Sequence, residues 1–274
     1  MTEAPFVLIL GMHRSGTSCL AGCLEACGLF LGEVSRLGRF NAKGNRESKT
    51  IWKLHDQILA LNKGTWHAPP ESVDVHPAFE GRVKEHIASL KRDGRSAGVK
   101  DPRTVLILDY WRQLIGNDCR VVGTFRHPIA VAQSLARRDG MSTRQALDLW
   151  VRYNTELVRH HKASAFPLVE YDLADSERYV SSVCNVARSV GLNALSNNVR
   201  EFVAPTLQHH ESEKRYIPDV CRSLYKYLKE NVIHDVPDRP FNHRPAWLRT
   251  SALAARNMFL QATHLPPNSE FEAP

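Results

Sequence analysis

Short apolar runs alternate with longer amphipathic stretches along most of the chain. The run at 6–10 ends at a glycine, the run at 97–100 ends at an Asp-Pro pair, and two similar runs lie at 120–125 and 167–171. Such runs are typical of strands that are buried on both faces, as in a parallel sheet. The stretches between and after them carry apolar residues at helical spacing, which predicts helices at 17–29, 50–62, 77–92, 103–115, 128–140, 142–162 and 176–190.

This alternation predicts an α/β fold, because strands joined by helices form a parallel sheet with right-handed crossovers. We expect a three-layer α/β/α arrangement around a central parallel sheet of about four to five strands, as in P-loop NTPases. The whole chain, 1–274, is expected to form one domain. Prolines interrupt the pattern near its end, so 236–274 is predicted to be a helical extension, with a helix near 246–263, and a loose tail.

The composition is that of a globular protein. Hydrophobic residues make up 43% and charged residues 24% of the 274, which excludes a disordered chain, a collagen-like chain and a disulfide-scaffold mini-protein. The net charge of +7 favours anionic partners, but it does not choose among a nucleotide, a polyanion and a membrane surface. The sequence carries no pattern typical of nucleic-acid binding, so no nucleic-acid partner is expected.

No apolar stretch reaches the length of about 18 residues that a membrane span needs, and no signal peptide opens the sequence. We therefore expect a cytoplasmic protein whose six cysteines are reduced thiols. Cys19, Cys23 and Cys27 recur every four residues on one helix face. Metal ligands usually follow C-x2-C spacing on turns, so these thiols are expected to pack the helix on the sheet, and no metal is expected.

A glycine-bounded loop at 11–18 connects the first predicted strand to the first helix. Backbone N–H groups and the helix dipole at such a loop favour a phosphate or a sulfate. The residues expected to hold that anion are His13, Arg14, Ser15, Gly16, Thr17 and Ser18. A nucleotide-hydrolysing P-loop would carry a lysine in place of Thr17, and the strongest positive charge here is instead Arg14.

A second basic segment follows the predicted strand at 120–125. Arg126 stands directly after that strand, Pro128 begins the next helix, and Ser134 lies about two helical turns further along. Open α/β sheets bind ligands at the carboxyl ends of their strands. We expect Arg126 and Ser134 to face that edge, where a guanidinium and a hydroxyl can bind a phosphate.

Together these segments resemble the sulfotransferases that use 3′-phosphoadenosine 5′-phosphosulfate (PAPS). Residues 14–18 are similar to the 5′-phosphosulfate loop of that family, and Arg126 with Ser134 is similar to its 3′-phosphate site. Further segments look like parts of its bacterial members, and they lie at 41–47, 100–103, 150–154 and 169–172. The resemblance covers the chain from residue 6 to about residue 173 and implies a P-loop-like fold.

The resemblance implies transfer of a sulfuryl group from PAPS to an acceptor hydroxyl, which leaves adenosine 3′,5′-bisphosphate (PAP). Arg14 is the candidate to stabilise the leaving phosphate oxygen, and Glu47 is the candidate base. Alternatively, Glu47 has a structural role, in which its negative charge interacts favourably with the dipole at the N-terminus of the next helix. His55 is the alternative base. It could instead be a half-buried histidine on a helix face with no catalytic role. Lys100 is expected to contact the sulfuryl group or the acceptor, or to pair with a carboxylate.

The acceptor is expected to be a small molecule or a glycan, and Arg103 is a candidate to bind it. The sequence specifies no oligomeric state. A basic loop carries Arg36, Arg39, Lys43 and Arg46. Three interpretations are open for it: it binds an anionic acceptor, it acts as a lid, or it remains a solvated loop. The candidates to stack on adenine, or to lie in the core, are Trp66, Trp111, Trp150 and Trp247.

Two other functions compete with sulfuryl transfer. The first is a P-loop kinase or NTPase, because 105–109 mimics an apolar strand that ends in a Mg²⁺-binding aspartate. The second is a noncatalytic binding module, which the net charge of +7 permits although the basic residues are dispersed.

Overall fold

The computed structural model describes residues 4–37, 43–203 and 216–233. Within them a parallel sheet consists of β1 (Phe6–Leu10), β2 (Ala97–Lys100), β3 (Cys119–Phe125) and β4 (Leu168–Glu170). The α-helices are α1 (Thr17–Ala26), α2 (Lys49–Leu61), α3 (Glu80–Lys91), α4 (Leu108–Ile115), α5 (Pro128–Asp139), α6 (Thr143–Ala163), α7 (Ser176–Ser189), α8 (Ser196–Val203) and α9 (Asp219–Glu230). Short 3-10 helices lie at Pro77–Phe79, Pro102–Ile107 and Gly116–Asp118.

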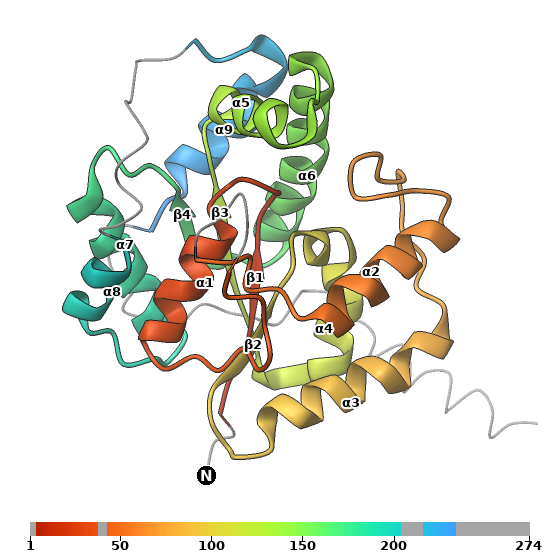
Figure 1. The fold of residues 1–274 in the computed structure, drawn as a ribbon, viewed down its shortest axis with the longest axis vertical. Coiled ribbons are helices and arrows are strands. Elements are labelled where there is room, and N and C mark those ends of the chain that lie inside the picture. The colour runs from red at the N-terminus through yellow and green to blue at the C-terminus, as the bar shows by residue number, and fades with distance from the viewer. Residues whose placement is uncertain (1–3, 38–42, 204–215, 234–274) are drawn as a thin grey trace, which may run out of the picture. The chain divides into compact units, whose positions relative to one another are not determined.

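The strand order is β2-β1-β3-β4, with all neighbours parallel (Figure 1). Within the sheet, β2 therefore lies on one side of β1 and β3 lies on the other, so the strand order reverses at β1. In the register of β1 and β3, Leu10 pairs with Gly123, so both strands end at the same edge. A reversal of strand order at such an edge opens a crevice that binds ligands in α/β proteins.

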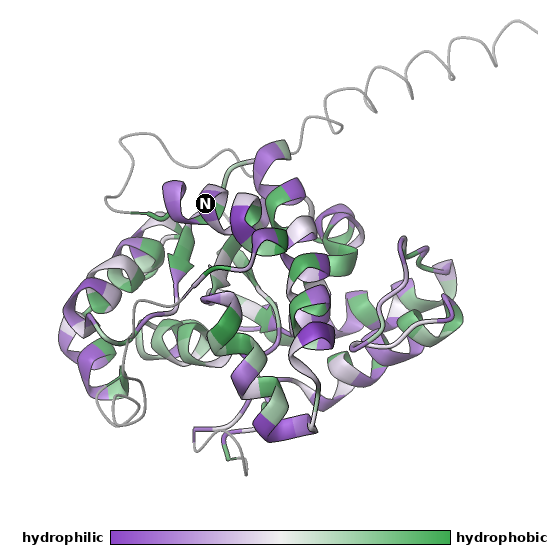
Figure 2. Ribbon diagram, turned by 90° about the horizontal axis from the view of Figure 1, so that it is seen from above, coloured by the Kyte–Doolittle hydropathy of each residue, from purple (hydrophilic) through white to green (hydrophobic). Residues whose placement is uncertain are grey.

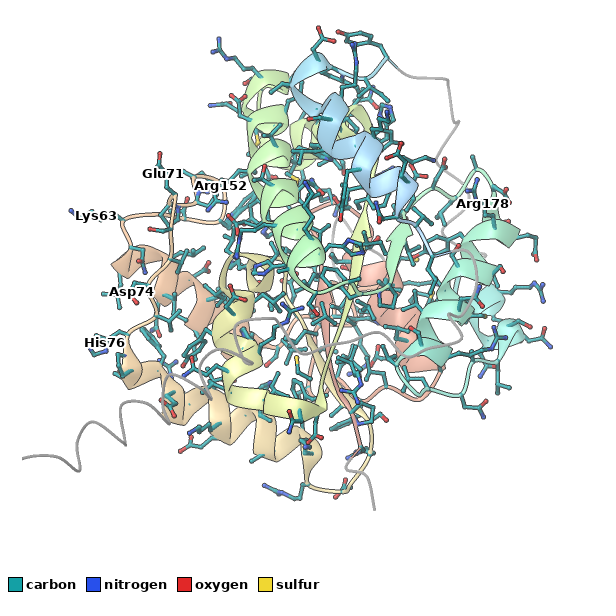
Figure 3. All side chains as sticks on the ribbon, turned by 180° about the vertical axis from the view of Figure 1, so that it is seen from behind. Lys63, Glu71, Asp74, His76, Arg152 and Arg178 are labelled. Atoms are coloured by element: carbon teal, nitrogen blue, oxygen red, sulfur yellow. The ribbon has the colours of Figure 1, made fainter. Side chains whose placement is uncertain are left out.

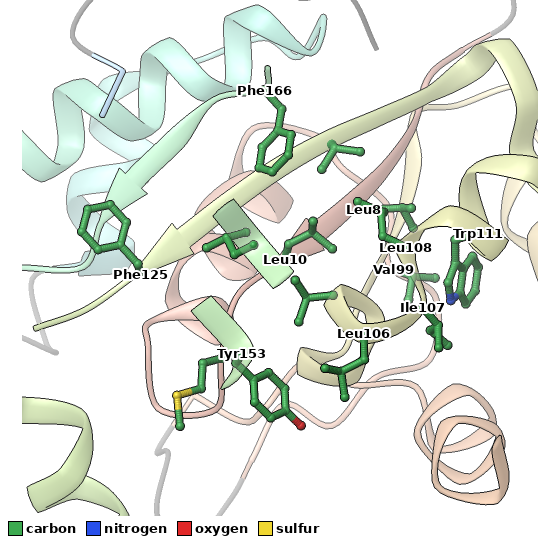
Figure 4. Close-up of a cluster of buried hydrophobic side chains, with 14 of the residues drawn as sticks. Leu8, Leu10, Val99, Leu106, Ile107, Leu108, Trp111, Phe125, Tyr153 and Phe166 are labelled. Atoms are coloured by element: carbon green, nitrogen blue, oxygen red, sulfur yellow. The ribbon is translucent and has the colours of Figure 1, made fainter. Parts of the chain in front are cut away.

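The strictly alternating direction of strand side chains divides the core into two halves, one on each face of the sheet. Phe6, Leu8 and Leu10 point into a core that is completed by α2, α3, α4, α5, α6 and α9. Val7 and Ile9 point into a second core, which α1, α7 and α8 cover. The first core is seen in Figure 4, where Leu8 and Leu10 lie among Val99, Leu106 and Tyr153. The expected three-layer α/β/α arrangement is thus confirmed.

Most helices carry both polar and apolar residues, as their mixed colouring shows (Figure 2). Helix α6 is capped at its start by Ser142: the backbone N–H of Gln145 donates to Ser142 Oγ, and the Gln145 side chain accepts from the Ser142 N–H. This capping box satisfies two N–H groups that the helix cannot pair itself. Helices α8 and α9 lie between the predicted helices at 176–190 and 246–263, where the sequence pattern specified none.

One predicted helix, 103–115, differs in the structure. The segment begins as a 3-10 helix at Pro102–Ile107, where the Arg103 N–H donates to the Asp101 side chain, and only Leu108–Ile115 is α-helical. Residues 105–109 are therefore not a strand, and the expected magnesium aspartate, Asp109, instead accepts from Arg159 on α6. The interpretation of this segment as part of a kinase or NTPase site was wrong.

The chain divides into two units, 1–243 and 244–274, and the described residues all belong to the first. The predicted extension at 236–274 and Trp247 lie outside the described residues. Among the helices that are described, none combines the length and the apolar composition of a membrane span. All six cysteines are described, and each is a buried thiol without a disulfide bond.

His160 on α6 makes the folded state sensitive to acid. Its side chain is 1% exposed, and its Nε2 lies 3.1 Å from the backbone oxygen of Val105. Burial lowers the pKa of His160 from 6.5 to about 4, against the opposing effect of Asp109. Between these pH values His160 binds a proton in the unfolded chain but not in the folded one. The free energy of unfolding therefore falls as the pH drops from about 6.5 towards about 4.

We predict that His160→Gln reduces this loss. Between pH 7 and pH 5 the wild-type protein should lose about 2 kcal/mol of unfolding free energy through His160, and the variant should lose that much less. Urea unfolding at the two pH values measures the difference. Equal losses in both proteins would show that His160 is protonated as easily in the folded state as in the unfolded one.

Candidate active site at the carboxyl edge of the sheet

The turn after β1 can be built only with glycine at its two bounding positions. Gly11 has φ 146°, and a Cβ there would lie 2.4 Å from the Thr124 backbone oxygen. Gly16 has φ 88°, and a Cβ there would lie 2.2 Å from the ring of Tyr171. Both positions combine the left-handed region with close packing, which only glycine tolerates. The turn is therefore held tightly against β3 and the end of β4.

Hydrogen bonds hold this turn in a shape that suits an anion. Thr124 Oγ1 on β3 donates to the Ser15 backbone oxygen at 3.1 Å, and the Ser15 N–H donates to Met12 O at 3.2 Å. Arg14 has φ 64°, a strained conformation that often marks functional positions. Helix α1 begins at Thr17, and its N-cap Gly16 has no side chain to cap the first-turn N–H groups. N–H groups at such a helix start favour an anion.

The two basic segments meet at this turn. Arg14 Nε donates to Ser134 Oγ on α5 at 2.8 Å, across 120 positions of sequence. Arg126 Nη1 donates to the Arg14 backbone oxygen at 3.5 Å. The Arg126 backbone is itself fixed, because the indole N–H of Trp150 donates to its oxygen at 3.0 Å. Arg14, Arg126 and Ser134 therefore form one site.

Positive charge is concentrated in this cluster. Burial lowers the pKa of Arg14, and the neighbouring charge of Arg138 lowers it further. The Arg126 guanidinium lies 5.2 Å from the centre of the Tyr171 ring, a cation–π contact. Cations that are desolvated and close together repel one another, so the binding of an anion here would relieve that repulsion.

A lysine and a glutamate meet beside the start of α1. Lys100, the last residue of β2, is 3% exposed, and its Nζ donates to Glu47 Oε1 at 2.7 Å and to Ser18 Oγ at 3.2 Å. Lys100 Nζ and Ser18 Oγ also donate to the Asn45 backbone oxygen, at 2.9 and 3.0 Å. Glu47 Oε2 has no hydrogen-bond partner among the described residues.

The residues that follow Lys100 form a buried polar network. Arg103 Nη1 donates to both Asp101 oxygens, at 3.1 and 3.0 Å, and Arg103 Nε donates to Asp56 Oδ1 at 2.8 Å. Burial acts to raise the pKa of Asp101, but His55 and Arg103 hold it well below its usual range. Burial acts to lower the pKa of Arg103, yet the charges of Asp101 and Asp56 raise it. This network holds the Lys100 backbone at the sheet edge.

His13 lies on the other side of the turn, against aromatic rings. Its ring centre is 4.5 Å from that of Trp66 and 5.7 Å from that of Tyr153. Burial lowers the pKa of His13 well below its ordinary value, and the charge of Arg103 lowers it further. His13 Nε2 is buried and has no hydrogen-bond partner among the described residues. Burial and the charge of Arg103 thus both favour the neutral imidazole of His13.

Comparison with solved structures is made at the level of the fold. A sulfotransferase domain from the olefin synthase of Synechococcus PCC 7002 superimposes with a TM-score of 0.51 and 18% sequence identity, over 86% of this chain and 98% of that domain. The chain has a sulfotransferase fold. No family model and no curated protein matches the sequence.

A second solved structure, retinol dehydratase in complex with androsterone and inactive cofactor PAP, matches less well. It gives a TM-score of 0.36 and 11% identity, over 88% of this chain and 84% of that one. The sulfotransferase fold, with its P-loop-like turn after β1, agrees with the fold that the sequence segments imply.

Within this sulfotransferase fold, some expected site residues lie elsewhere. His55 is fully buried: the Trp111 indole N–H donates to its Nε2 at 3.1 Å, and its Nδ1 lies 3.3 Å from Asp101. No acceptor hydroxyl can reach it, so the assignment of His55 as the alternative base was wrong. Trp111 and Trp150 are core residues and cannot stack on adenine.

The expected basic loop binds mainly to the protein itself. Arg36 and Arg46 both pair with Glu25 on α1, at 2.8 and 2.6 Å. Lys43 Nζ donates to the backbone oxygen of Phe202 and lies over its ring. Arg39 lies outside the described residues. These contacts do not support a grip on an anionic acceptor.

Within the part of the chain that the structure describes, no group of three or more His, Cys, Asp or Glu side chains is arranged to hold a metal ion. The thiols of Cys19, Cys23 and Cys27 pack α1 in the second core, as their spacing predicts.

Sequence reasoning missed three contributors to the site. Tyr171 packs against Gly16 and under Arg126, Thr124 holds the turn after β1, and Asp56 anchors Arg103. Tyr171 directly follows β4 at the same sheet edge, and this position after a predicted strand could have identified it as a site residue. Thr124 and Asp56 carry no local signal, because their roles come from contacts distant in sequence.

We predict that Gly16→Ala destabilises the protein. The left-handed backbone alone costs a non-glycine residue about 1–3 kcal/mol, and the added Cβ must also displace Tyr171. Urea unfolding measures the change. Gly81→Ala is the matched control, since a Cβ at that helical position meets nothing within 4 Å, and it should gain about 0.5–1 kcal/mol. Equal stability of the two variants would contradict the packing described for the turn.

Proposed function

We propose that this chain transfers a sulfuryl group from PAPS to a hydroxyl group of an acceptor. The observation that carries the proposal is the contact of the two phosphate-binding segments, in which Arg14 Nε donates to Ser134 Oγ at 2.8 Å and Arg126 reaches the Arg14 backbone. A donor with a phosphosulfate at one end and a 3′-phosphate at the other requires two adjoining anion sites of this kind.

The donor bears about four negative charges, so cations and helix N–H groups supply most of its binding. In this proposal Arg126 and Ser134 bind the 3′-phosphate. The backbone N–H groups of 15–18 and Arg14 bind the 5′-phosphosulfate. The hydroxyls of Ser15, Thr17 and Ser18 line the same turn, and Ser15 Oγ is buried without a hydrogen-bond partner among the described residues.

The reaction follows from these positions. The acceptor oxygen attacks sulfur, the bond from sulfur to the bridging phosphate oxygen breaks, and PAP leaves with the electron pair of that bond. Arg14 stabilises the charge that grows on the leaving oxygen. Lys100, held at the sheet edge by Asn45 O and Glu47, contacts the sulfuryl oxygens. Positioning and electrostatics dominate such transfers, and the scheme requires no metal.

Glu47 is the base in this proposal. Its Oε1 is held by Lys100, which leaves Oε2 to accept the proton of the acceptor hydroxyl. Glu47 is 17% exposed at its side chain, so it borders both the buried lysine and the solvent side of the site. His55 has no comparable access.

Arg126→Met is expected to weaken PAP binding about 10- to 100-fold, because a charge-assisted hydrogen bond is worth about 1.5–3 kcal/mol. Thermal shift titration with PAP measures the affinity. Arg178→Met is the control, since Arg178 is an exposed arginine on α7 that is not among the proposed site residues (Figure 3). If wild-type protein shows no thermal shift with PAP, the proposed donor is wrong.

Glu47→Gln is expected to lower the transfer rate at least 100-fold, since a general base typically contributes a factor of about 10²–10⁴. PAP affinity should stay within about twofold, because Glu47 accepts a proton and does not bind the donor. PAP release and the mass gain of the acceptor measure the rate. Full activity of this variant would remove Glu47 from the role of base.

A further inference from the structure

The polar groups beside Lys100 and Glu47 form a fixed, nearly charge-balanced surface. Arg103 Nε is bound to Asp56 Oδ1 and Arg103 Nη1 to both oxygens of Asp101. Among the described residues, Arg103 Nη2 and Asp56 Oδ2 make no hydrogen bond. In the described part of the chain, one donor and one acceptor of the Arg103–Asp56 ion pair therefore remain without a partner.

This ion pair adjoins the reacting groups. Arg103 lies three residues after Lys100, and the charge of Glu47 contributes to the pKa of Arg103. Asp101 is 1% exposed, whereas the Asp56 side chain is 40% exposed. Asp56 is thus the side of the network that an incoming molecule can reach.

His13, Trp66 and Tyr153 form an aromatic wall, and the charges of Arg103 and Asp101 act on His13 and Tyr153. Trp66 packs on His13 at 4.5 Å between ring centres, and Tyr153 Oη donates to the Trp66 backbone oxygen at 2.9 Å. The segment that carries Trp66 is held by Arg152, whose Nη2 donates to the backbone oxygens of Pro70 and Glu71 at 2.8 and 2.9 Å. Figure 3 shows Arg152 and Glu71 together at the rim of the molecule. The wall is therefore rigidly placed.

Charge decides which acceptors this surface suits. Lys100, Arg103 and Arg138 supply three positive charges, and the Arg138 guanidinium lies 5.1 Å from the centre of the Trp66 ring. Glu47, Asp56, Asp101 and Asp139, which pairs with Arg138, supply four negative charges, so the local excess is one negative charge. His13 is neutral and adds none. An anionic acceptor would meet net repulsion here, although the whole chain carries +7.

We propose that the acceptor is a neutral sugar unit, bound with neighbouring hydroxyls between Asp56 and Arg103 and with its ring beside Trp66 and His13. A hydroxyl both donates and accepts, so a pair of adjacent hydroxyls satisfies the carboxylate oxygen and the guanidinium N–H together. The proposal rests on the proposed sulfuryl transfer. In it one sugar hydroxyl loses its proton to Glu47, and its oxygen forms the new bond to sulfur while PAP departs.

Asp56→Asn is the informative variant. It keeps the size of the side chain but removes the charged acceptor, so KM for a neutral oligosaccharide should rise at least tenfold while PAP affinity stays unchanged. Gln57→Ala is the matched control on the same helix, because Gln57 is exposed and bonds Arg82 instead of the site. PAP release with mass gain of the acceptor gives KM, and thermal shift with PAP gives donor affinity.

The acceptor class is tested on wild-type protein with PAPS and four probes: neutral oligosaccharides, 4-nitrophenol, a primary amine and an acidic peptide. Binding of PAP-loaded protein to a neutral glycan array provides a second readout. Sulfation or array binding of neutral glycans, weakened in Asp56→Asn, supports the proposal. It is overturned by a preference for another probe, by the absence of both sulfation and array binding, or by an Asp56→Asn variant that matches wild type. PAP binding in those cases would leave sulfuryl transfer standing, whereas no PAP binding would remove it as well.

Discussion

The parallel pairing of β1 with β3 brings together two basic segments that the chain keeps far apart. Leu10 pairs with Gly123, so the turns after the two strands leave the sheet at one edge. Arg14 and Arg126 are 112 positions apart in sequence, yet one donates to the backbone of the other. Strand register sets this proximity, because a shift by one residue would turn each strand's side chains to the opposite face.

Gathering cations at a buried edge is unfavourable, and the surrounding core supplies the stability that permits it. Thr124 and Trp150 hold the backbones of Ser15 and Arg126 through single hydrogen bonds at 3.1 and 3.0 Å. Neither contact touches a ligand, but each stops the turn from relaxing and separating the charges. Such preorganised positive charge favours an anion that carries two charged groups close together.

The two ends of the site differ in their electrostatics. Around the turn after β1, burial and the charge of Arg138 lower the pKa of Arg14, as expected where positive charge accumulates. Beside β2, each cation is matched by carboxylates at hydrogen-bonding distance. The net charge of the whole chain therefore does not predict which acceptor binds beside β2, because ion pairing over a few ångströms outweighs charges spread over the surface.

The sequence by itself determined the layer order of the fold, the turn at 11–18 and the position of Arg14, Arg126 and Ser134 at one edge of the sheet. These features rest on local patterns: apolar runs of strand length, glycines at a tight turn, and a proline that begins a helix. Only the tertiary structure decided that His55 is buried against Asp101, that Lys100 pairs with Glu47, and that Asp56 pairs with Arg103. Which side of a helix faces a neighbouring loop depends on packing between elements that are distant in sequence, and local periodicity carries no information about that packing.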